Sequence, residues 1–141
     1  MSSNWQIYAL GSAFFAGLTA VLAKVGVSGI PSNTATLIRT LVVCVFLSIL
    51  VGLRQEWTNP LALDRKCLIF LILSAIATGL SWILYFRALQ TGNASVVASI
   101  DKLSLPFTVI LSILFLGEHL LFWQWVGVGL TMLGAFLIGW K

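Results

Sequence analysis

The chain has 141 residues, of which 60% are hydrophobic and only 9% are charged, whereas an ordinary soluble domain carries about 25% charged residues. Eight Lys and Arg and four Asp and Glu side chains cannot cover a soluble domain of this size, so the composition excludes a soluble enzyme and a disordered tail. The net charge of +4 does not indicate nucleic-acid binding, because the basic residues are scattered through apolar runs. The sequence predicts an integral membrane protein with a single domain, residues 1–141, that has the lipid bilayer as its surroundings.

Apolar runs of the length that a bilayer requires, about 20 residues, occur five times along the chain. The first run has no basic segment before it and is too long for the apolar part of a signal peptide, so we expect it to stay in the protein. An all-α, polytopic fold with five transmembrane helices follows. The predicted spans are Trp5–Val27, Pro31–Leu53, Cys67–Gln90, Ala94–Phe115 and Leu120–Trp140.

The residues that could bind metals or catalyse reactions are few. Cys44 and Cys67 lie in apolar runs and are expected to act as small apolar residues, and His119 has no second metal ligand near it in the sequence. The sequence also contains no phosphate-binding Gly-rich loop and no nucleophile–base motif. We therefore expect no metal, no cofactor and no enzymatic activity.

The basic residues do not define an orientation in the membrane. Five spans place the two termini on opposite sides, and three basic residues fall on each side, so the positive-inside rule is balanced. If Lys24 and Arg87 serve a function and are not counted, the loop between the second and third spans places the N-terminus in the cytoplasm. Both interpretations stay open at this stage. The two sets are Arg54, Arg65 and Lys66 on one side, and Lys24, Arg87 and Lys141 on the other.

A sequence pattern in the last two spans resembles a known family. It comprises ALQTGNAS at Ala88–Ser95, LPF at Leu105–Phe107, FLGEH at Phe115–His119, and QWVG at Gln124–Gly127, continuing to Gly134. This pattern is similar to the repeat unit of EamA-type transporters in the drug/metabolite transporter superfamily. A weaker likeness covers the first two spans.

The resemblance implies a secondary transporter that exports small organic metabolites or drugs across the plasma (inner) membrane. Typical family members carry two such repeats, and because five helices is an odd number, the repeats lie inverted in the membrane. One repeat alone suggests an antiparallel, dual-topology homodimer that works by alternating access. A parallel oligomer and pairing with another half-length protein are the structural alternatives, and a channel-like pore formed by the dimer or an accessory membrane subunit are the functional ones.

Besides Arg87, which is expected to act as an anchor, four charged residues lie inside the predicted spans, where each costs at least about 2.5–3.5 kcal/mol at the helix centre. Arg39 lies about 12 Å along its helix from Pro31, and the alternating topology brings all four in from the same side. We predict that they line one solute cavity and that Asp101 pairs with Arg39 or Lys24. Because the cavity would be net positive, its solute is expected to be anionic or zwitterionic. Alternatively, Lys24 is an interfacial anchor and Arg39 with Asp101 is a structural ion pair. The four residues are Lys24, Arg39, Asp101 and Lys102.

Polar and aromatic residues share one face of the third span and are predicted to complete the cavity: Thr78, Ser81, Trp82 and Tyr85. Packing against lipid or another helix is the alternative for Trp82. In the fourth span, Pro106 is predicted to free the carbonyl of Lys102 for a ligand and to act as a hinge, with a static kink as the alternative. In the fifth span, small residues at four-residue spacing predict a seam for helix packing or dimerisation: Gly127, Thr131, Ala135 and Gly139.

Overall fold

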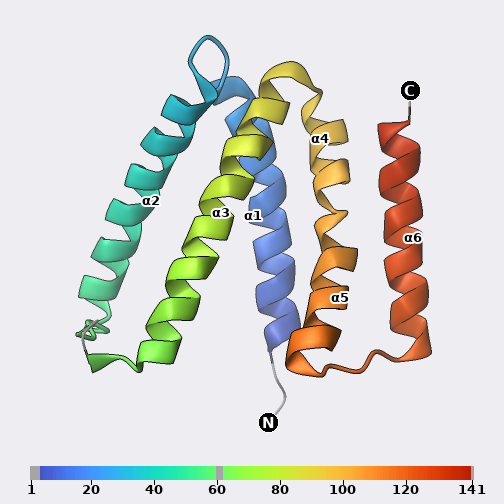
Figure 1. The fold of residues 1–141 in the computed structure, drawn as a ribbon. Helices are drawn as coiled ribbons and strands as arrows, with labels where there is room; N and C mark the ends of the chain where they lie inside the picture. The colour runs from blue at the N-terminus through green and yellow to red at the C-terminus, as the bar shows by residue number, and fades with distance from the viewer. Residues whose placement is uncertain (1–3, 60–61, 141) are drawn as a thin grey trace. The chain divides into compact units, whose positions relative to one another are not determined.

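The computed structural model describes residues 4–59 and 62–140, and within them the chain forms six α-helices and no strand (Figure 1). Together the helices make five spans long and apolar enough to cross a membrane, because α4 and α5 share one span. Every span ends within two residues of its predicted bounds, so the prediction of five transmembrane helices is confirmed. The helices are α1 (Trp5–Gly26), α2 (Ser32–Leu53), α3 (Arg65–Thr91), α4 (Ala94–Asp101), α5 (Ser104–Leu116) and α6 (Phe122–Gly139).

Glycine and proline determine where two of the helices stop and start. Gly117 ends α5 in the left-handed conformation with φ 67°, which glycine adopts without a steric penalty. Pro31 holds the position before α2 with φ −59°, and the missing N–H costs nothing there because the first turn has no intrahelical acceptor. Local chemistry therefore explains where α5 ends and where α2 begins.

The fourth span is broken rather than merely kinked. Because Pro106 has no N–H, it cannot bond to the carbonyl of Lys102, and the chain tightens into bonds between residues three apart. Lys102 N–H donates to Ser99, and Leu105 N–H donates to the carbonyl of Lys102 at 3.0 Å. The prediction that this carbonyl is free for a ligand was therefore wrong, since the shorter turn supplies a replacement donor.

The described chain forms two compact units. The first unit contains α1 up to Lys24 together with α4, α5 and α6, and within it α6 packs against α4 and touches α5. The second unit, Val25–Gln90, contains α2 and nearly all of α3, which run antiparallel. The expectation of a single domain stays a prediction.

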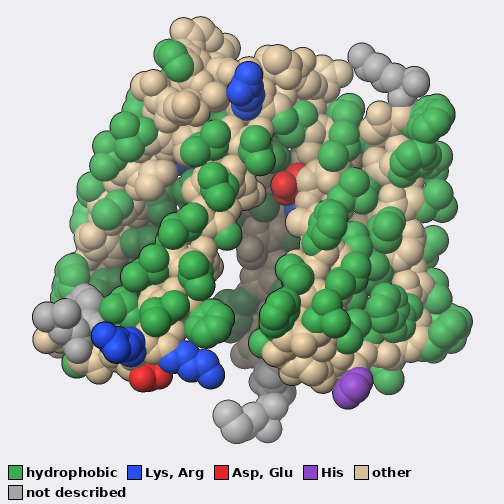
Figure 2. Space-filling model, viewed as in Figure 1, with side chains coloured by type: hydrophobic (Ala, Val, Ile, Leu, Met, Phe, Trp, Pro, Cys, Tyr) green, Lys and Arg blue, Asp and Glu red, His purple; other side chains and the backbone are tan. Residues whose placement is uncertain are grey.

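The chain itself covers very little of its helices. At most 6% of the most apolar window of each span is buried, and Figure 2 shows hydrophobic side chains spread over the visible face of the helices. A soluble protein could not leave so much apolar surface exposed, whereas lipid and other membrane helices cover it without cost. The described residues that are buried are Ala20, Val27, Ala35, Thr36, Phe86, Leu89, Val109 and Ala135.

Candidate solute-binding site

A charged side chain from α2 meets an aromatic wall from α3 inside the second unit. The guanidinium carbon of Arg39 lies 4.3 Å from the ring centroid of Trp82 and 5.4 Å from that of Phe86. Arg39 stands seven residues after Ser32, the first residue of α2, which places it about 10 Å inside the helix. The structure therefore holds a cation at membrane depth against the faces of two rings.

The spacing of the aromatic residues on α3 builds this wall. Trp82 and Phe86 are four residues apart and so share one helix face, and Tyr85 lies three residues after Trp82 on the same side. Phe86 is only 3% exposed, so its ring is fixed by packing. The phenol of Tyr85 also interacts electrostatically with Arg39. The sequence had indicated Trp82 and Tyr85 but not Phe86, because a buried phenylalanine in an apolar helix carries no distinguishing signal.

The N–H groups of Arg39 are the open part of this site. Its polar neighbours on α2 are engaged elsewhere: Thr36 Oγ1 donates to the carbonyl of Ser32 at 2.9 Å, and Thr40 Oγ1 donates to that of Thr36 at 2.8 Å. Across the described residues, no buried side-chain nitrogen or oxygen lacks a hydrogen-bond partner. Arg39 lies against two rings and is partly exposed, so we expect an incoming molecule to reach its N–H groups. This arrangement suits a carboxylate or phosphate, which a guanidinium binds through two parallel hydrogen bonds.

The other two predicted residues on α3 lie nearer its N-terminus. Thr78 and Ser81 are both exposed, and the hydroxyl of Thr78 donates to the carbonyl of Ser74 at 2.9 Å. A hydroxyl that bonds within its own helix turns its methyl side outward and offers only an acceptor to a solute. Their contact with a solute stays a prediction.

Lys24 in the first unit has a different environment from Arg39. Its ammonium group donates to the backbone carbonyl of Gly92 at 2.9 Å, which ties the end of α1 to the turn between α3 and α4. This bond joins two segments of the first unit, and the alternative of an interfacial anchor also stays a prediction. A role for Lys24 in solute binding stays a prediction.

Asp101 and Lys102 lie at the break in the fourth span. Asp101 is the last residue of α4, Lys102 follows as its C-cap, and both side chains are exposed. Because the helix is interrupted here, the angle between the two side chains differs from that in a continuous helix, and sequence spacing could not show this. The pairing of Asp101 with Arg39 or Lys24, and the roles of Asp101 and Lys102 towards a solute, stay predictions, as does the use of Pro106 as a hinge.

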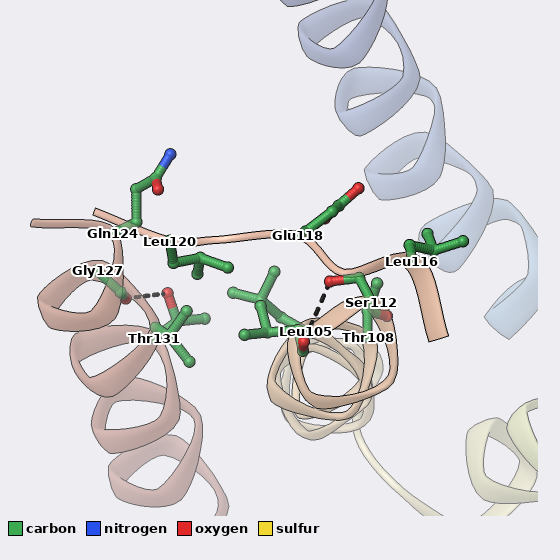
Figure 3. A pocket seen from close by; sticks show the side chains of 11 residues that line it. Leu105, Thr108, Ser112, Leu116, Glu118, Leu120, Gln124, Gly127 and Thr131 are labelled. Atoms are coloured by element: carbon green, nitrogen blue, oxygen red, sulfur yellow. Dashed lines mark hydrogen bonds between the residues drawn. The ribbon is translucent and has the colours of Figure 1, made fainter. Parts of the chain in front are cut away.

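The small-residue stripe of α6 faces helices of the same unit. Ala135 is 5% exposed, and a Cβ atom added at Gly139 would lie 3.2 Å from the side chain of Ile100 in α4. Gly127 and Thr131 line a groove between α5 and α6 with a volume of about 590 Å³ (Figure 3). The stripe therefore lies against its own chain along part of its length, and its use in a dimer stays a prediction.

The α5–α6 groove is a weaker candidate for solute binding than the Arg39 site. The hydroxyls of Thr108, Ser112 and Thr131 all donate to carbonyls of their own helices, at 2.9–3.1 Å. Glu118 and Gln124 line the groove, but their side chains extend away from Leu105 and Thr131 in Figure 3. The groove is therefore mainly apolar and has no cation.

No group of three His, Cys, Asp or Glu side chains in residues 4–59 and 62–140 is placed to hold a metal ion. Cys44 and Cys67 are both free and exposed on the helices. Five spans, a cation within them and an aromatic wall beside that cation are features of a membrane protein that handles polar solutes.

Comparison with known proteins agrees with these features. Residues 3–140 match the EamA-like transporter family. The chain belongs to the EamA-like transporter family. It is a multi-pass integral membrane protein and a transporter by family, and the resemblance drawn from the sequence is confirmed.

Two relatives are similar in sequence to this EamA-like chain. An "uncharacterized transporter in cobO 3′ region" from Sinorhizobium sp. is 48% identical over 138 residues, which is 98% of each chain. An uncharacterized protein of Methanocaldococcus jannaschii is 35% identical over 83 residues, 59% of this chain and 61% of that one. No solved structure gives a significant match. The Sinorhizobium relative has nearly the same length as this chain.

Proposed function

We propose that this EamA-like chain is a secondary transporter that exports small organic anions or zwitterions, and that Arg39 binds their acidic group. The observation that carries the proposal is the guanidinium of Arg39, which lies 4.3 Å from the ring centroid of Trp82 in a residue that is partly exposed. Thr78, Ser81, Tyr85, Asp101 and Lys102 are proposed as further contributors to the solute pathway.

The energetics favour an anionic ligand. A charged residue at the centre of a membrane helix costs at least about 2.5–3.5 kcal/mol, and a cation–π contact returns about 0.5–2 kcal/mol. The rings therefore stabilise Arg39 only in part. A solute carboxylate would supply two charge-assisted hydrogen bonds in a site with little competing water, which offsets the remainder. Arg39 is thus held in place without being neutralised, as a reversible binding site requires.

We further propose that two copies assemble as an antiparallel homodimer and move the solute by alternating access. Three basic residues on each side give the chain no preferred orientation. The spans leave nearly all of their surface available to a second copy, since at most 6% of each apolar window is buried. An inverted pair of five-helix repeats is the general architecture of transporters with an odd helix number per repeat.

Counterflow in proteoliposomes tests the transport proposal. Vesicles loaded with unlabelled organic acids should accumulate a labelled acid from outside, and the methyl esters of the same acids should not compete. Accumulation driven by exchange separates a transporter from a channel-like pore, in which labelled solute only equilibrates. Equal competition by acids and their esters would contradict the assignment of Arg39 to an acidic group.

A topology reporter tests the dimer. When it is fused after the C-terminus, it should be detected on both sides of the membrane in intact cells. Two or three lysines added to the loop between α2 and α3 should force one orientation and abolish transport, and mixing chains biased in opposite directions should restore it. Full transport by a chain of one fixed orientation would contradict the antiparallel dimer, and a stoichiometric foreign protein in mild detergent would support an accessory subunit instead.

A further inference from the structure

The buried residues of the second unit all lie towards one end of the unit. Five of the eight buried residues lie at this end, two in the first turns of α2, two in the last turns of α3, and one in the turn between α1 and α2. Beyond Arg39 towards the end of α2, and before Trp82 in α3, no described residue is buried. The five buried residues of the second unit, which we call the plug, are Val27, Ala35, Thr36, Phe86 and Leu89.

Arg39 stands at the boundary between these two regions. It follows Thr36 by three residues on α2, and its guanidinium lies 5.4 Å from the ring of Phe86, a member of the plug. Leu89, one turn further along α3, is completely buried. Within this unit a solute at Arg39 therefore has the plug on one side and exposed helix surface on the other.

A single polar side chain bonds across the plug end. The amide of Gln90 donates to the backbone carbonyls of Ile30 at 2.7 Å and Val27 at 3.3 Å. Both carbonyls follow the end of α1, where carbonyl groups have no acceptor role within the helix. Gln90 thus joins the last turn of α3 to the turn that leads into α2.

The binding residues and Gln90 lie on one stripe of α3. Trp82, Phe86 and Gln90 are spaced by four residues, so the ring under Arg39, the ring in the plug and the bonded amide follow one another along the same face. A movement of α3 that separates Gln90 from the α1–α2 turn would therefore also move both rings away from the guanidinium.

We propose that Gln90 is the latch of a gate, that the plug is the gate, and that the solute leaves Arg39 on the plug side only when the two hydrogen bonds of Gln90 break. This inference rests on the proposed function, since it names the regulation of access to that same site. A latch of two neutral hydrogen bonds suits the task, because such bonds are weak enough to break on a transport timescale and strong enough to bias a closed state.

The rate of thiol labelling inside the plug measures the gate without any solute. In a Cys44→Ser, Cys67→Ser background, Ala35→Cys places a reporter at a residue that is 8% exposed. In purified full-length protein, a polar maleimide should label this reporter on the order of tenfold faster when Gln90→Leu or Gln90→Glu is added, since both remove the amide donor. Thr36→Cys, also at an 8% exposed site, is a second reporter for the case in which Ala35→Cys does not fold.

Gln124→Leu is the matched control. It removes another glutamine whose side chain bonds to the backbone, as Gln124 Oε1 accepts from the N–H of Leu121 at 2.7 Å, but in the first unit. Labelling of the plug reporter should change less than twofold in this variant. Unchanged labelling in folded Gln90→Leu and Gln90→Glu, or an equal increase in Gln124→Leu, would overturn the latch.

Transport kinetics separate a latch from a merely structural bond. A carrier without the latch is biased towards the form that is open at the plug. It can still close when solute is bound but returns slowly in the empty form, so Gln90→Leu should retain counterflow and lose net flux by about tenfold. A structural lesion would lower both equally and would overturn the proposal. Faster labelling in a protein that does not bind organic acids would instead reject the proposed solute and leave the latch standing.

Discussion

The two units stabilise a membrane-embedded cation in opposite ways. In the first unit, the ammonium of Lys24 donates to the carbonyl of Gly92, so a hydrogen-bond donor is used to fasten a turn. In the second unit, the guanidinium of Arg39 rests on the faces of Trp82 and Phe86, which accept no conventional hydrogen bond and leave its N–H groups accessible. A backbone carbonyl engages the first cation and two rings hold the second, and we propose that only the second binds a solute.

The largest expected effect comes from exchanging Arg39 for an apolar residue. Arg39→Met should lower counterflow by at least about 100-fold, because charge-assisted bonds to the solute are worth about 1.5–3 kcal/mol each. The melting temperature should change little, since the variant strands no buried carboxylate within the unit. Flux and melting are measured on the same purified protein, with Arg87→Gln, an exposed cation on α3, as the control.

Arg39→Lys tests whether the shape of the guanidinium or only its charge is needed. A lysine keeps the charge but loses the planar fork and its stacking on an indole, so transport should fall to an intermediate level. Wild-type flux through Arg39→Met would break the comparison, because it would place the solute elsewhere.

A smaller effect is expected from the aromatic wall. Trp82→Ala should raise the apparent KM about tenfold, because the guanidinium loses the ring that orients it. Trp82→Phe should keep most of the affinity, since a ring face remains. A solute that contacts this site should also change the tryptophan fluorescence of the wild type and not that of Trp82→Phe. Equal KM values for the alanine variant and the wild type would show that the stacking is incidental.

Lys24→Met should lower stability and leave transport nearly unchanged, which is the opposite of Arg39→Met. Removing a charged donor that fastens the Gly92 turn should lower the free energy of unfolding by about 1–2 kcal/mol, which thermal unfolding in one detergent measures. Counterflow per folded molecule should stay within about threefold of the wild type. Loss of transport with unchanged stability would assign Lys24 to the solute pathway and remove the contrast between the units.

The smallest effects concern the packing of the first unit. Gly139→Leu should destabilise the protein by about 1–3 kcal/mol, because even a Cβ at this position lies 3.2 Å from Ile100 of α4. At Gly127 nothing lies within 4 Å of an added Cβ, so Gly127→Leu should leave the fold intact. Melting curves and cross-linking of the two variants separate packing within the chain from a dimer seam. A reduced dimer fraction in Gly127→Leu alone would place the second copy at the groove.

Much of the candidate site could be predicted from single residues, but its arrangement could not. Charged residues stand out in an apolar span because of their cost, so Arg39 was found, and the shared helix face indicated Trp82 and Tyr85. Phe86 and Gln90 were missed, since one is an ordinary apolar residue and the other lies at a helix end where glutamine is common. The prediction of a free carbonyl at Lys102 was wrong. The missing N–H of Pro106 removes one donor to this carbonyl, but the tighter turn lets the N–H of Leu105 donate to it instead.

The sequence by itself determined that this protein lies in a lipid bilayer, and it determined the number and length of its spans. The length of the apolar runs and the need to satisfy backbone hydrogen bonds in lipid leave few alternatives to transmembrane helices. Only the tertiary structure decided which donors are used and which are left accessible. Lys24 lies in the last turn of α1 and Arg39 is the eighth residue of α2, and one meets a carbonyl whereas the other meets rings. That outcome depends on which faces of distant helices meet, and in an apolar helix the hydrophobic pattern does not distinguish one face from another.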